Sequence, residues 1–274
     1  MSTVSAEPTR QSTRLGPILL LAALVITLVA AVWQEMTGPT YPVRTTVTLA
    51  SQSFPVKLTR SWSTGDQPVE LTVGDPAVQA RVRWRRYPSS QDWQVLGMTR
   101  SGDQLQAALP HQPPAGKLEY QVELTRGNER VIIPDRPAVT RFKGEVPAAL
   151  LVPHIFAMFL GMLFSARAGL EALVRGPARR WLTMVAFGLL LFGGFVLGPL
   201  VQKFAFGAYW TGIPWGYDLT DNKTLIAVAA WLFAAWRVYR RPATARWSLV
   251  FAALATLVVF AIPHSVWGSE IKWK

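Results

Sequence analysis

The chain has 274 residues, of which 50% are hydrophobic and only 16% are charged. This balance is too apolar for one ordinary soluble domain and too mixed for a purely membrane-embedded bundle, so two kinds of region are expected. The absence of cysteine excludes structural disulfides, thiolate metal sites, thiol nucleophiles and covalent attachment of haem through a C-x-x-C-H motif.

The first predicted element is a transmembrane helix over residues 15–33, an uncharged run of nineteen residues that follows Arg10 and Arg14. At 1.5 Å per residue, such a run crosses a hydrocarbon core about 30 Å thick. A cleaved signal peptide is the alternative, because Val29-Ala30-Ala31 offers small residues, but this apolar run exceeds the usual length of roughly 7–15 residues. Residues 1–14 are then expected to form a cytoplasmic tail.

Residues 34–147 are expected to form an extracytoplasmic β-sandwich domain, because apolar and polar residues alternate there with the period of half-buried strands. The clearest alternating runs are 43–49, 80–84 and 118–124. About seven strands over roughly 100 residues, separated by turn signals, predict an immunoglobulin-like or fibronectin-like sandwich. Core or hairpin packing, rather than ligand binding, is the interpretation of its tryptophans, Trp62, Trp84 and Trp93.

Residues 148–274 are predicted to form a four-helix transmembrane domain with an outer loop at 202–222. Its apolar runs cover residues 148–164, 181–200, 225–236 and 247–262. The third run is short for a span, so its helix is expected to begin near Asp221 and to end near Tyr239. The predicted fold class is therefore an α-helical membrane bundle of about five transmembrane helices with an inserted all-β domain.

The formal net charge of +12 follows this topology and does not indicate a nucleic-acid partner. The segments expected in the cytoplasm carry ten arginines and two glutamates, a net +8, whereas residues 34–147 carry only +3. An excess of arginine in the inner loops is the positive-inside signature. We therefore expect an integral protein of the lipid bilayer, in a bacterial inner membrane, with the β domain and the C-terminus outside.

Two of the three histidines are expected at the outer face, His154 on the second helix and His264 after the fifth. A histidine on a membrane helix is costly unless it is paired or ligating, and imidazole is a good ligand for haem iron. Each follows a proline, so the alternative is that each simply caps a helix end in the wet interface. As a pair at one membrane level, they are candidate metal ligands.

The outer loop combines the aromatic residues Tyr209, Trp210 and Trp215 with glycines that let backbone approach a flat ligand. The alternative for its tryptophans is the aromatic belt of membrane proteins. Asp218 precedes the next helix, where a cap of the helix N-terminus is the alternative. The glycines and the polar run 218–223 favour a functional loop, since an aromatic belt needs neither.

The segment Phe206-Gly207-Ala208-Tyr209-Trp210, followed by Gly216-Tyr217-Asp218-Leu219-Thr220, resembles the tryptophan-rich signature of the haem-handling proteins of cytochrome c maturation. In that family the signature is an outer loop flanked by two haem-ligating histidines. The resemblance implies His154 and His264 as axial ligands and Tyr209, Trp210, Trp215 and Asp218 as a platform for the ring. The chain departs from the family by inserting residues 211–215 and the β domain, by Phe206 in place of a tryptophan, and by lacking a sixth helix.

The expected function is that of a membrane-anchored haem-binding or haem-presenting protein with a role in cytochrome assembly, whose β domain docks a protein partner. The alternative is a non-catalytic scaffold or accessory subunit of a membrane protein complex. An enzyme is disfavoured, because the sequence has no Gly-x-Ser-x-Gly elbow, no His-Glu-x-x-His pair and no phosphate loop.

Overall fold

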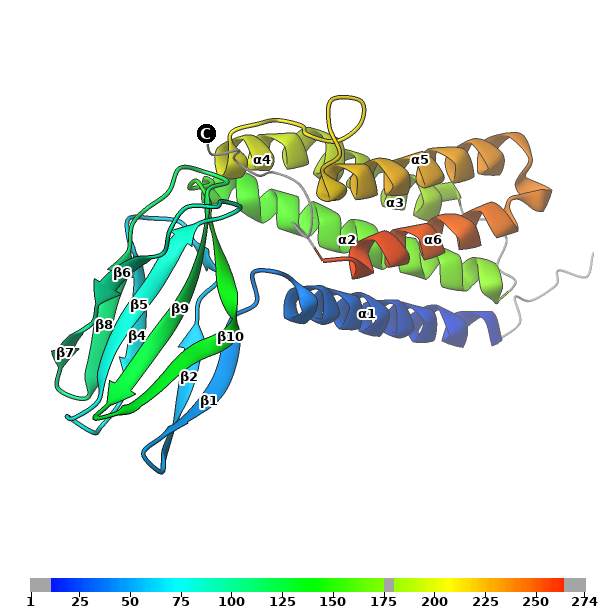
Figure 1. Ribbon diagram of the computed structural model, residues 1–274. Coiled ribbons are helices and arrows are strands. Elements are labelled where there is room, and N and C mark those ends of the chain that lie inside the picture. The colour runs from blue at the N-terminus through cyan, green and yellow to red at the C-terminus, as the bar shows by residue number, and fades with distance from the viewer. Residues whose placement is uncertain (1–10, 175–179, 264–274) are drawn as a thin grey trace, which may run out of the picture. The chain divides into compact units, whose positions relative to one another are not determined.

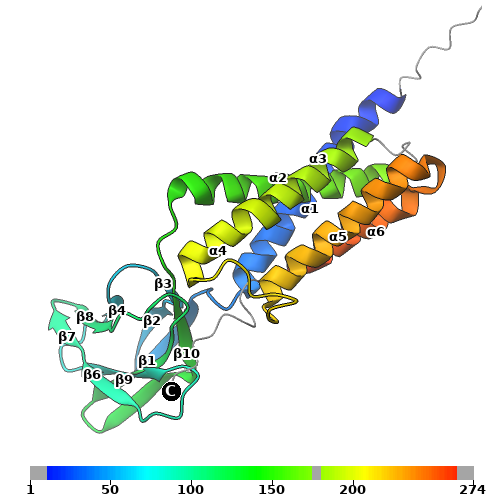
Figure 2. The same cartoon turned by 90° about the horizontal axis from the view of Figure 1, so that it is seen from above.

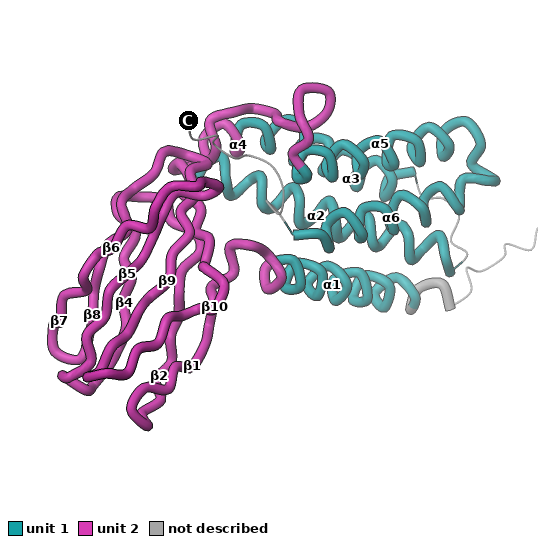
Figure 3. Tube along the Cα trace, viewed as in Figure 1, with its two compact units in different colours: residues 1–34, 148–200, 219–263 teal, residues 35–147, 201–218, 264–274 magenta. Residues whose placement is uncertain are grey.

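The structure is a computed structural model that describes residues 11–174 and 180–263, with only the backbone for residues 11–14. The chain combines helices with antiparallel and mixed β-sheets (Figure 1). It divides into two compact units, which we describe separately (Figure 3). The helical unit comprises residues 1–34, 148–200 and 219–263, and the β unit comprises residues 35–147, 201–218 and 264–274.

Six α-helices, a π-helical segment and a short 3-10 helix lie in the described part of the chain. They are α1 (Gln11–Thr37), α2 (Ala148–Leu173), α3 (Arg180–Leu191), the π-helical segment η1 (Phe192–Leu197), α4 (Gly198–Phe206), α5 (Leu219–Arg240), η2 (Pro242–Thr244) and α6 (Arg246–Ala261). Within the helical unit, α2 packs against α3 and α6, and α5 packs against the same two helices (Figures 1 and 2). The elements from α3 to α4 follow one another without a break.

Three helices are long and apolar enough to cross a membrane: Leu15–Thr37, Ala148–Leu173 and Arg180–Phe206. The sequence pattern predicts five. α6 is apolar but has only 16 residues. α5 has 22 residues, yet Asp221, Lys223, Arg237 and Arg240 lie near its ends and lower its apolar character.

Small residues allow the helices of the helical unit to approach closely. A Cβ added to Gly169 of α2 would lie 2.4 Å from the Cβ of Ala253, and one added to Gly161 would lie 3.0 Å from Leu190. Such small residues are typical of helix contacts in membranes, where van der Waals packing replaces the hydrophobic effect. One buried polar contact joins α5 to α6, where Trp231 Nε1 donates to Thr256 Oγ1 at 2.9 Å.

Several arginines in the described part of the helical unit lie where α2 and α5 end and where α3 and α6 begin. Arg246 donates to the Leu173 carbonyl at 2.8 Å, and the Arg180 guanidinium lies 5.4 Å from the Tyr239 ring centroid. Arg167 forms an ion pair with Glu171 one turn further along α2. These contacts place Arg180, at the start of α3, and Arg246, at the start of α6, at one end of the unit.

The part of the β unit that the structure describes contains ten strands, arranged in three sheets. They are β1 (Val43–Leu49), β2 (Gln52–Leu58), β3 (Ser61–Trp62), β4 (Gln67–Thr72), β5 (Gln79–Arg86), β6 (Gln94–Gly97), β7 (Thr99–Ser101), β8 (Gln104–Leu109), β9 (Lys117–Arg126) and β10 (Glu129–Phe142). The five-stranded sheet has the order β3-β10-β9-β5-β6, and the smaller sheets are β1-β2 and β4-β8-β7. All pairings are antiparallel except β3 with β10.

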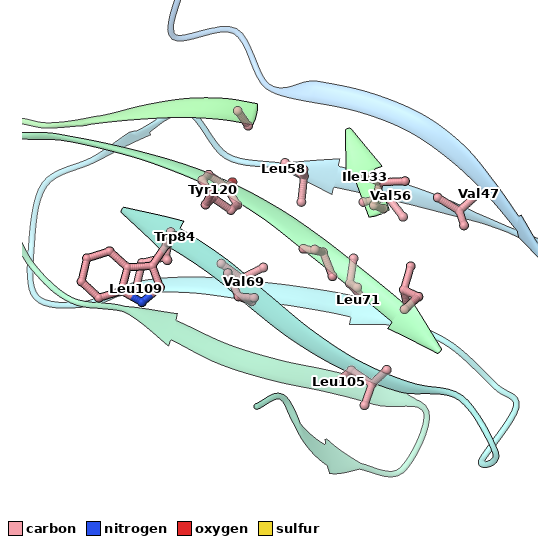
Figure 4. Close-up of a cluster of buried hydrophobic side chains, with 14 of the residues drawn as sticks. Val47, Val56, Leu58, Val69, Leu71, Trp84, Leu105, Leu109, Tyr120 and Ile133 are labelled. Atoms are coloured by element: carbon pink, nitrogen blue, oxygen red, sulfur yellow. The ribbon is translucent and has the colours of Figure 1, made fainter. Parts of the chain in front are cut away.

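One hydrophobic core is shared by the three sheets, because alternate residues of each strand point inward. β9 shows this clearly: Leu118, Tyr120, Val122 and Leu124 are all fully buried. They meet inward residues of the smaller sheets, including Val47, Val56, Val69 and Leu105 (Figure 4). Trp84 lies in this core and the partly buried Trp62 packs against it, as the sequence predicts.

The outer face of the five-stranded sheet holds a buried carboxylate between two arginines. Glu123 on β9 accepts from Arg81 on β5 at 2.6 Å and from Arg130 on β10 at 2.8 Å. Burial acts to raise the pKa of Glu123, but the two guanidinium groups outweigh it and hold this pKa below its ordinary value. The charged form of Glu123 is therefore the form that the fold stabilises.

Acid is expected to destabilise the β unit through Glu123. A carboxylate whose pKa is lowered on folding contributes its stability above the unfolded-state pKa, and this contribution is lost as the pH falls through the folded-state pKa. The free energy of unfolding should therefore decline as the pH is lowered below about 4.5. Glu123→Gln should cost about 1.5–3 kcal/mol at neutral pH and flatten this decline.

Both the loss of stability at neutral pH and the decline in acid can be measured by chemical denaturation at a series of pH values, with near-ultraviolet circular dichroism as the signal. Glu70→Gln is the matched control, because Glu70 is exposed on β4 and should change stability little. An equal acid decline in wild type and Glu123→Gln would contradict this account of Glu123.

Candidate functional site

His154 lies on α2, where its imidazole reaches the π-helical segment. The Nδ1 atom is 3.0 Å from the carbonyl oxygen of Gly193. Because a carbonyl oxygen only accepts, Nδ1 carries the proton of this hydrogen bond, and Nε2 of the neutral ring keeps its lone pair. Histidines that bind metals are commonly oriented by such a bond from the other ring nitrogen.

Two glycines let the π-helical segment fit between α2 and α5. A Cβ added to Gly193 would lie 2.7 Å from Met158 Sδ, and one added to Gly194 would lie 2.4 Å from Thr224 Cγ2. Thr224 itself is fixed by a hydrogen bond from its hydroxyl to the Thr220 carbonyl at 3.0 Å. π-helical turns within α-helices occur often at functional sites, since they redirect backbone and side chains.

His264, the second predicted ligand, lies outside the described residues. The chain that leads to it is held by two side chains from other helices. Lys223 Nζ of α5 donates to the carbonyls of Ile262 at 2.6 Å and Pro263 at 3.4 Å. Gln34 Nε2 of α1 donates to the Phe260 carbonyl at 2.7 Å and to that of Ile262 at 3.3 Å.

Lys223 is buried, and its ammonium group lies where the negative end of the α6 dipole favours a cation. Sequence reasoning missed Lys223 and Gln34 as contributors to this end of the helical unit. The available signal was a lysine at the start of an apolar helix, because a charged side chain there is costly unless it has partners.

Backbone hydrogen bonds hold the loop that follows α4 in a compact form. The amides of Trp215 and Gly216 both donate to the Gly212 carbonyl at 2.9 Å, and the Asp218 amide donates to the Thr211 carbonyl at 3.0 Å. A Cβ on Gly216 would lie 2.3 Å from the Thr211 oxygen, so only glycine fits here. This loop contains four of the predicted site residues.

The predicted platform residues differ in exposure. Tyr209 and Trp215 are 56% and 81% exposed, whereas Asp218 is buried. Trp210 is half-buried, and its Nε1 donates to the Ile213 carbonyl at 3.1 Å. Lys203 covers the Tyr209 ring, with Nζ 5.4 Å from the ring centroid. Of these three aromatic rings, that of Trp215 is the most exposed, while the carboxylate of the loop is buried.

The loop belongs to the β unit, although the sequence pattern assigns it to the transmembrane domain. The Gly144 amide, which follows β10, donates to the Ala205 carbonyl at 2.9 Å. The guanidinium of Arg141 on β10 lies 5.3 Å from the Phe206 ring centroid. Burial lowers the pKa of the neighbouring Lys143, Glu35 opposes this effect, and Arg141 adds to it.

The predicted site residues therefore fall into three groups. The structure brings Tyr209, Trp210, Trp215 and Asp218 together in one loop of the β unit. His154 belongs to the helical unit, and His264 lies outside the described residues. Within residues 11–174 and 180–263, no group of three or more His, Asp or Glu side chains could hold a bare metal ion.

Haem requires less from the protein than a bare ion does, because its porphyrin already supplies four nitrogen ligands and the protein adds one or two axial groups. The proton on Nδ1 of His154 suits the residue to this role, and exposed aromatic faces suit the ring. No protein-family model, curated protein or solved structure matches this chain.

Proposed function

We propose that the chain is a polytopic membrane protein that binds or presents haem and performs no bond-making chemistry. The observation that carries the proposal is the hydrogen bond between His154 Nδ1 and the Gly193 carbonyl. It orients the imidazole and leaves Nε2 as the iron-binding nitrogen. The roles of His264 as a second ligand and of Tyr209, Trp210, Trp215 and Asp218 as a ring platform stay predictions from the sequence.

Spectroscopic titration tests the proposal. Purified protein in nanodiscs of neutral lipid is titrated with haemin, and empty nanodiscs serve as the blank, since haemin partitions into lipid. We expect a Soret band of histidine-ligated haem that saturates at one haem per protein. A spectrum indistinguishable from that of haemin in empty nanodiscs would refute haem binding by this chain.

We further propose that α5 and α6 also cross the bilayer, which gives five transmembrane helices. The 22 residues of α5 reach about 33 Å at 1.5 Å per residue, and its charges lie near its ends. The clustering of Arg180 and Arg246 at one end of the helical unit supports a cytoplasmic location for that end. The β unit, proposed to be an immunoglobulin-like sandwich, and the C-terminus then lie outside, in a bacterial inner membrane.

Labelling of single cysteines tests this orientation in a chain that has none of its own. Cysteines placed at Gly102 and Ser269 should react with an impermeant maleimide added outside. A cysteine at Ala243, between α5 and α6, should react only after the membrane is opened. The reverse pattern would refute the orientation, and an immunoglobulin-like assignment would be refuted by an experimental structure in which the sheets close into a barrel.

A non-catalytic scaffold is the second candidate function. The aromatic loop follows α4, whose Ala205 is bonded to Gly144 just after β10. The exposed Trp215 and Tyr217 therefore belong to the unit expected to dock a partner, which favours a scaffold. Exposed aromatic residues are common at protein interfaces. In the haemin titration a scaffold gives no Soret band, so the same experiment separates the two functions.

A further inference from the structure

A row of arginine side chains lies along β5 on the outer face of the five-stranded sheet. Val82 and Trp84 of β5 point into the core, so the alternate residues Arg81, Arg83 and Arg85 point to the opposite face. Arg130 of β10 joins them through Glu123, which it shares with Arg81. We call these four residues, Arg81, Arg83, Arg85 and Arg130, the arginine face.

The carboxylates of this face are buried beneath its guanidinium groups. The side chains of Arg81 and Arg130 are 49% and 52% exposed, whereas that of Glu123 is 0% exposed. Arg85 pairs with Glu119 at 2.5 Å in the same manner, and Glu119 is buried. The arginine face therefore exposes hydrogen-bond donors and positive charge to solvent, although the buried Glu119 and Glu123 neutralise part of this charge.

Arg83 is positioned by an aromatic ring. Its guanidinium carbon lies 5.3 Å from the centroid of Trp93, and that of Arg85 lies 4.7 Å from the same centroid. Opposite Arg83, β9 presents the uncharged Gln121, whose amide donates to the Pro134 carbonyl at 2.8 Å. Within the described chain, no carboxylate pairs with Arg83, so its charge is oriented and not neutralised.

We propose that the arginine face docks an extended acidic segment of a protein partner. Side chains at alternate positions of a strand repeat about every 6.7 Å, and carboxylates at alternate positions of an extended peptide repeat at the same interval. The guanidinium of Arg83, which has no carboxylate partner within the described chain, can match a carboxylate of that segment through two parallel hydrogen bonds, while the paired arginines around it add positive charge. The proposal specifies a partner for the β unit and does not depend on haem binding.

Binding of a defined peptide to the full chain in neutral-lipid nanodiscs tests the proposal. The probe is a fluorescein-labelled peptide of alternating Glu and Thr, about twelve residues long, so that its carboxylates repeat at the strand interval. The matched probe has Gln in place of Glu. We expect the Glu peptide to bind, its affinity to fall as salt is raised, and the Gln peptide not to bind.

Arg83→Gln should weaken binding of the Glu peptide about threefold to fivefold, and Arg83→Lys should recover only part of this loss. Arg44→Gln is the control, because Arg44 is exposed on β1, in another sheet, and the substitution removes the same charge. Equal weakening by Arg83→Gln and Arg44→Gln would overturn the proposal, since it would indicate diffuse attraction.

Absence of Glu-peptide binding would also overturn the proposal. The proposal would also be overturned if the chain in nanodiscs bound anionic phosphatidylglycerol vesicles through Arg83 but bound no peptide. That result would indicate that the arginine face binds a lipid surface. Failure of the haemin titration leaves these outcomes unchanged, so the two proposals fail separately.

Discussion

Replacing His154 with alanine is expected to abolish the Soret band of the haem-loaded protein, or to weaken haem binding by at least about 100-fold. Changes to groups that merely orient a metal-bound histidine typically cost 10–100-fold in affinity, so loss of the ligand itself should cost no less. The measurement is the haemin titration in nanodiscs, repeated with the variant at equal protein concentration.

His111→Ala is the matched control, because it removes the same side chain from the β unit. The His111 ring packs edge-on against Phe142, with centroids 5.5 Å apart, and we assign it no ligand role. His154→Gly adds a second test, since free imidazole added to this variant should restore the Soret band. An unchanged band in His154→Ala would show that any bound haem is held elsewhere.

The sequence predicts the main elements because burial leaves a periodic trace in them. Alternation along residues 118–124 predicts β9, and each of its inward residues lies in the core. The helix expected between Asp221 and Tyr239 is found as Leu219–Arg240. Strands as short as β3, with two residues, and β7, with three, leave too few positions for a period to be recognised.

Features that depend on contacts distant in sequence could not be predicted in the same way. The π-helical segment at Phe192–Leu197 has an apolar sequence like that of its flanking helix, and its fit depends on Thr224, which lies in another helix. The bond between Gly144 and Ala205 joins segments that the hydropathy pattern assigns to different domains. Long-range pairing of this kind has no local sequence signature.

The orientation of the His154 imidazole depends on its hydrogen bond to the π-helical segment, and therefore on how that segment packs. The acceptor of its hydrogen bond is a backbone carbonyl, so no side-chain substitution at Gly193 removes it directly. The position of that carbonyl depends on how closely the adjoining Gly194 approaches α5. Packing between Gly194 and Thr224 should therefore influence both the stability of the helical unit and the orientation of the imidazole.

Gly194→Ala is expected to destabilise the helical unit by about 1–3 kcal/mol, because the new Cβ would lie 2.4 Å from Thr224 Cγ2 and would force the two helices apart. Gly188→Ala makes the same change on α3 with nothing within 4 Å, and should be neutral or stabilising by about 0.5–1 kcal/mol. Unfolding of the detergent-solubilised protein, followed by tryptophan fluorescence, measures both variants.

Thr224→Ser identifies the cause of the loss, because serine lacks the Cγ2 methyl group and keeps the hydroxyl that donates to the Thr220 carbonyl. In a double-mutant cycle, Gly194→Ala combined with Thr224→Ser should recover more than half of the stability that Gly194→Ala loses. If haem binds through His154, the Soret affinity should fall in Gly194→Ala and recover in the double variant. Additive losses in the double variant would show that Gly194 is required for a reason other than its contact with Thr224.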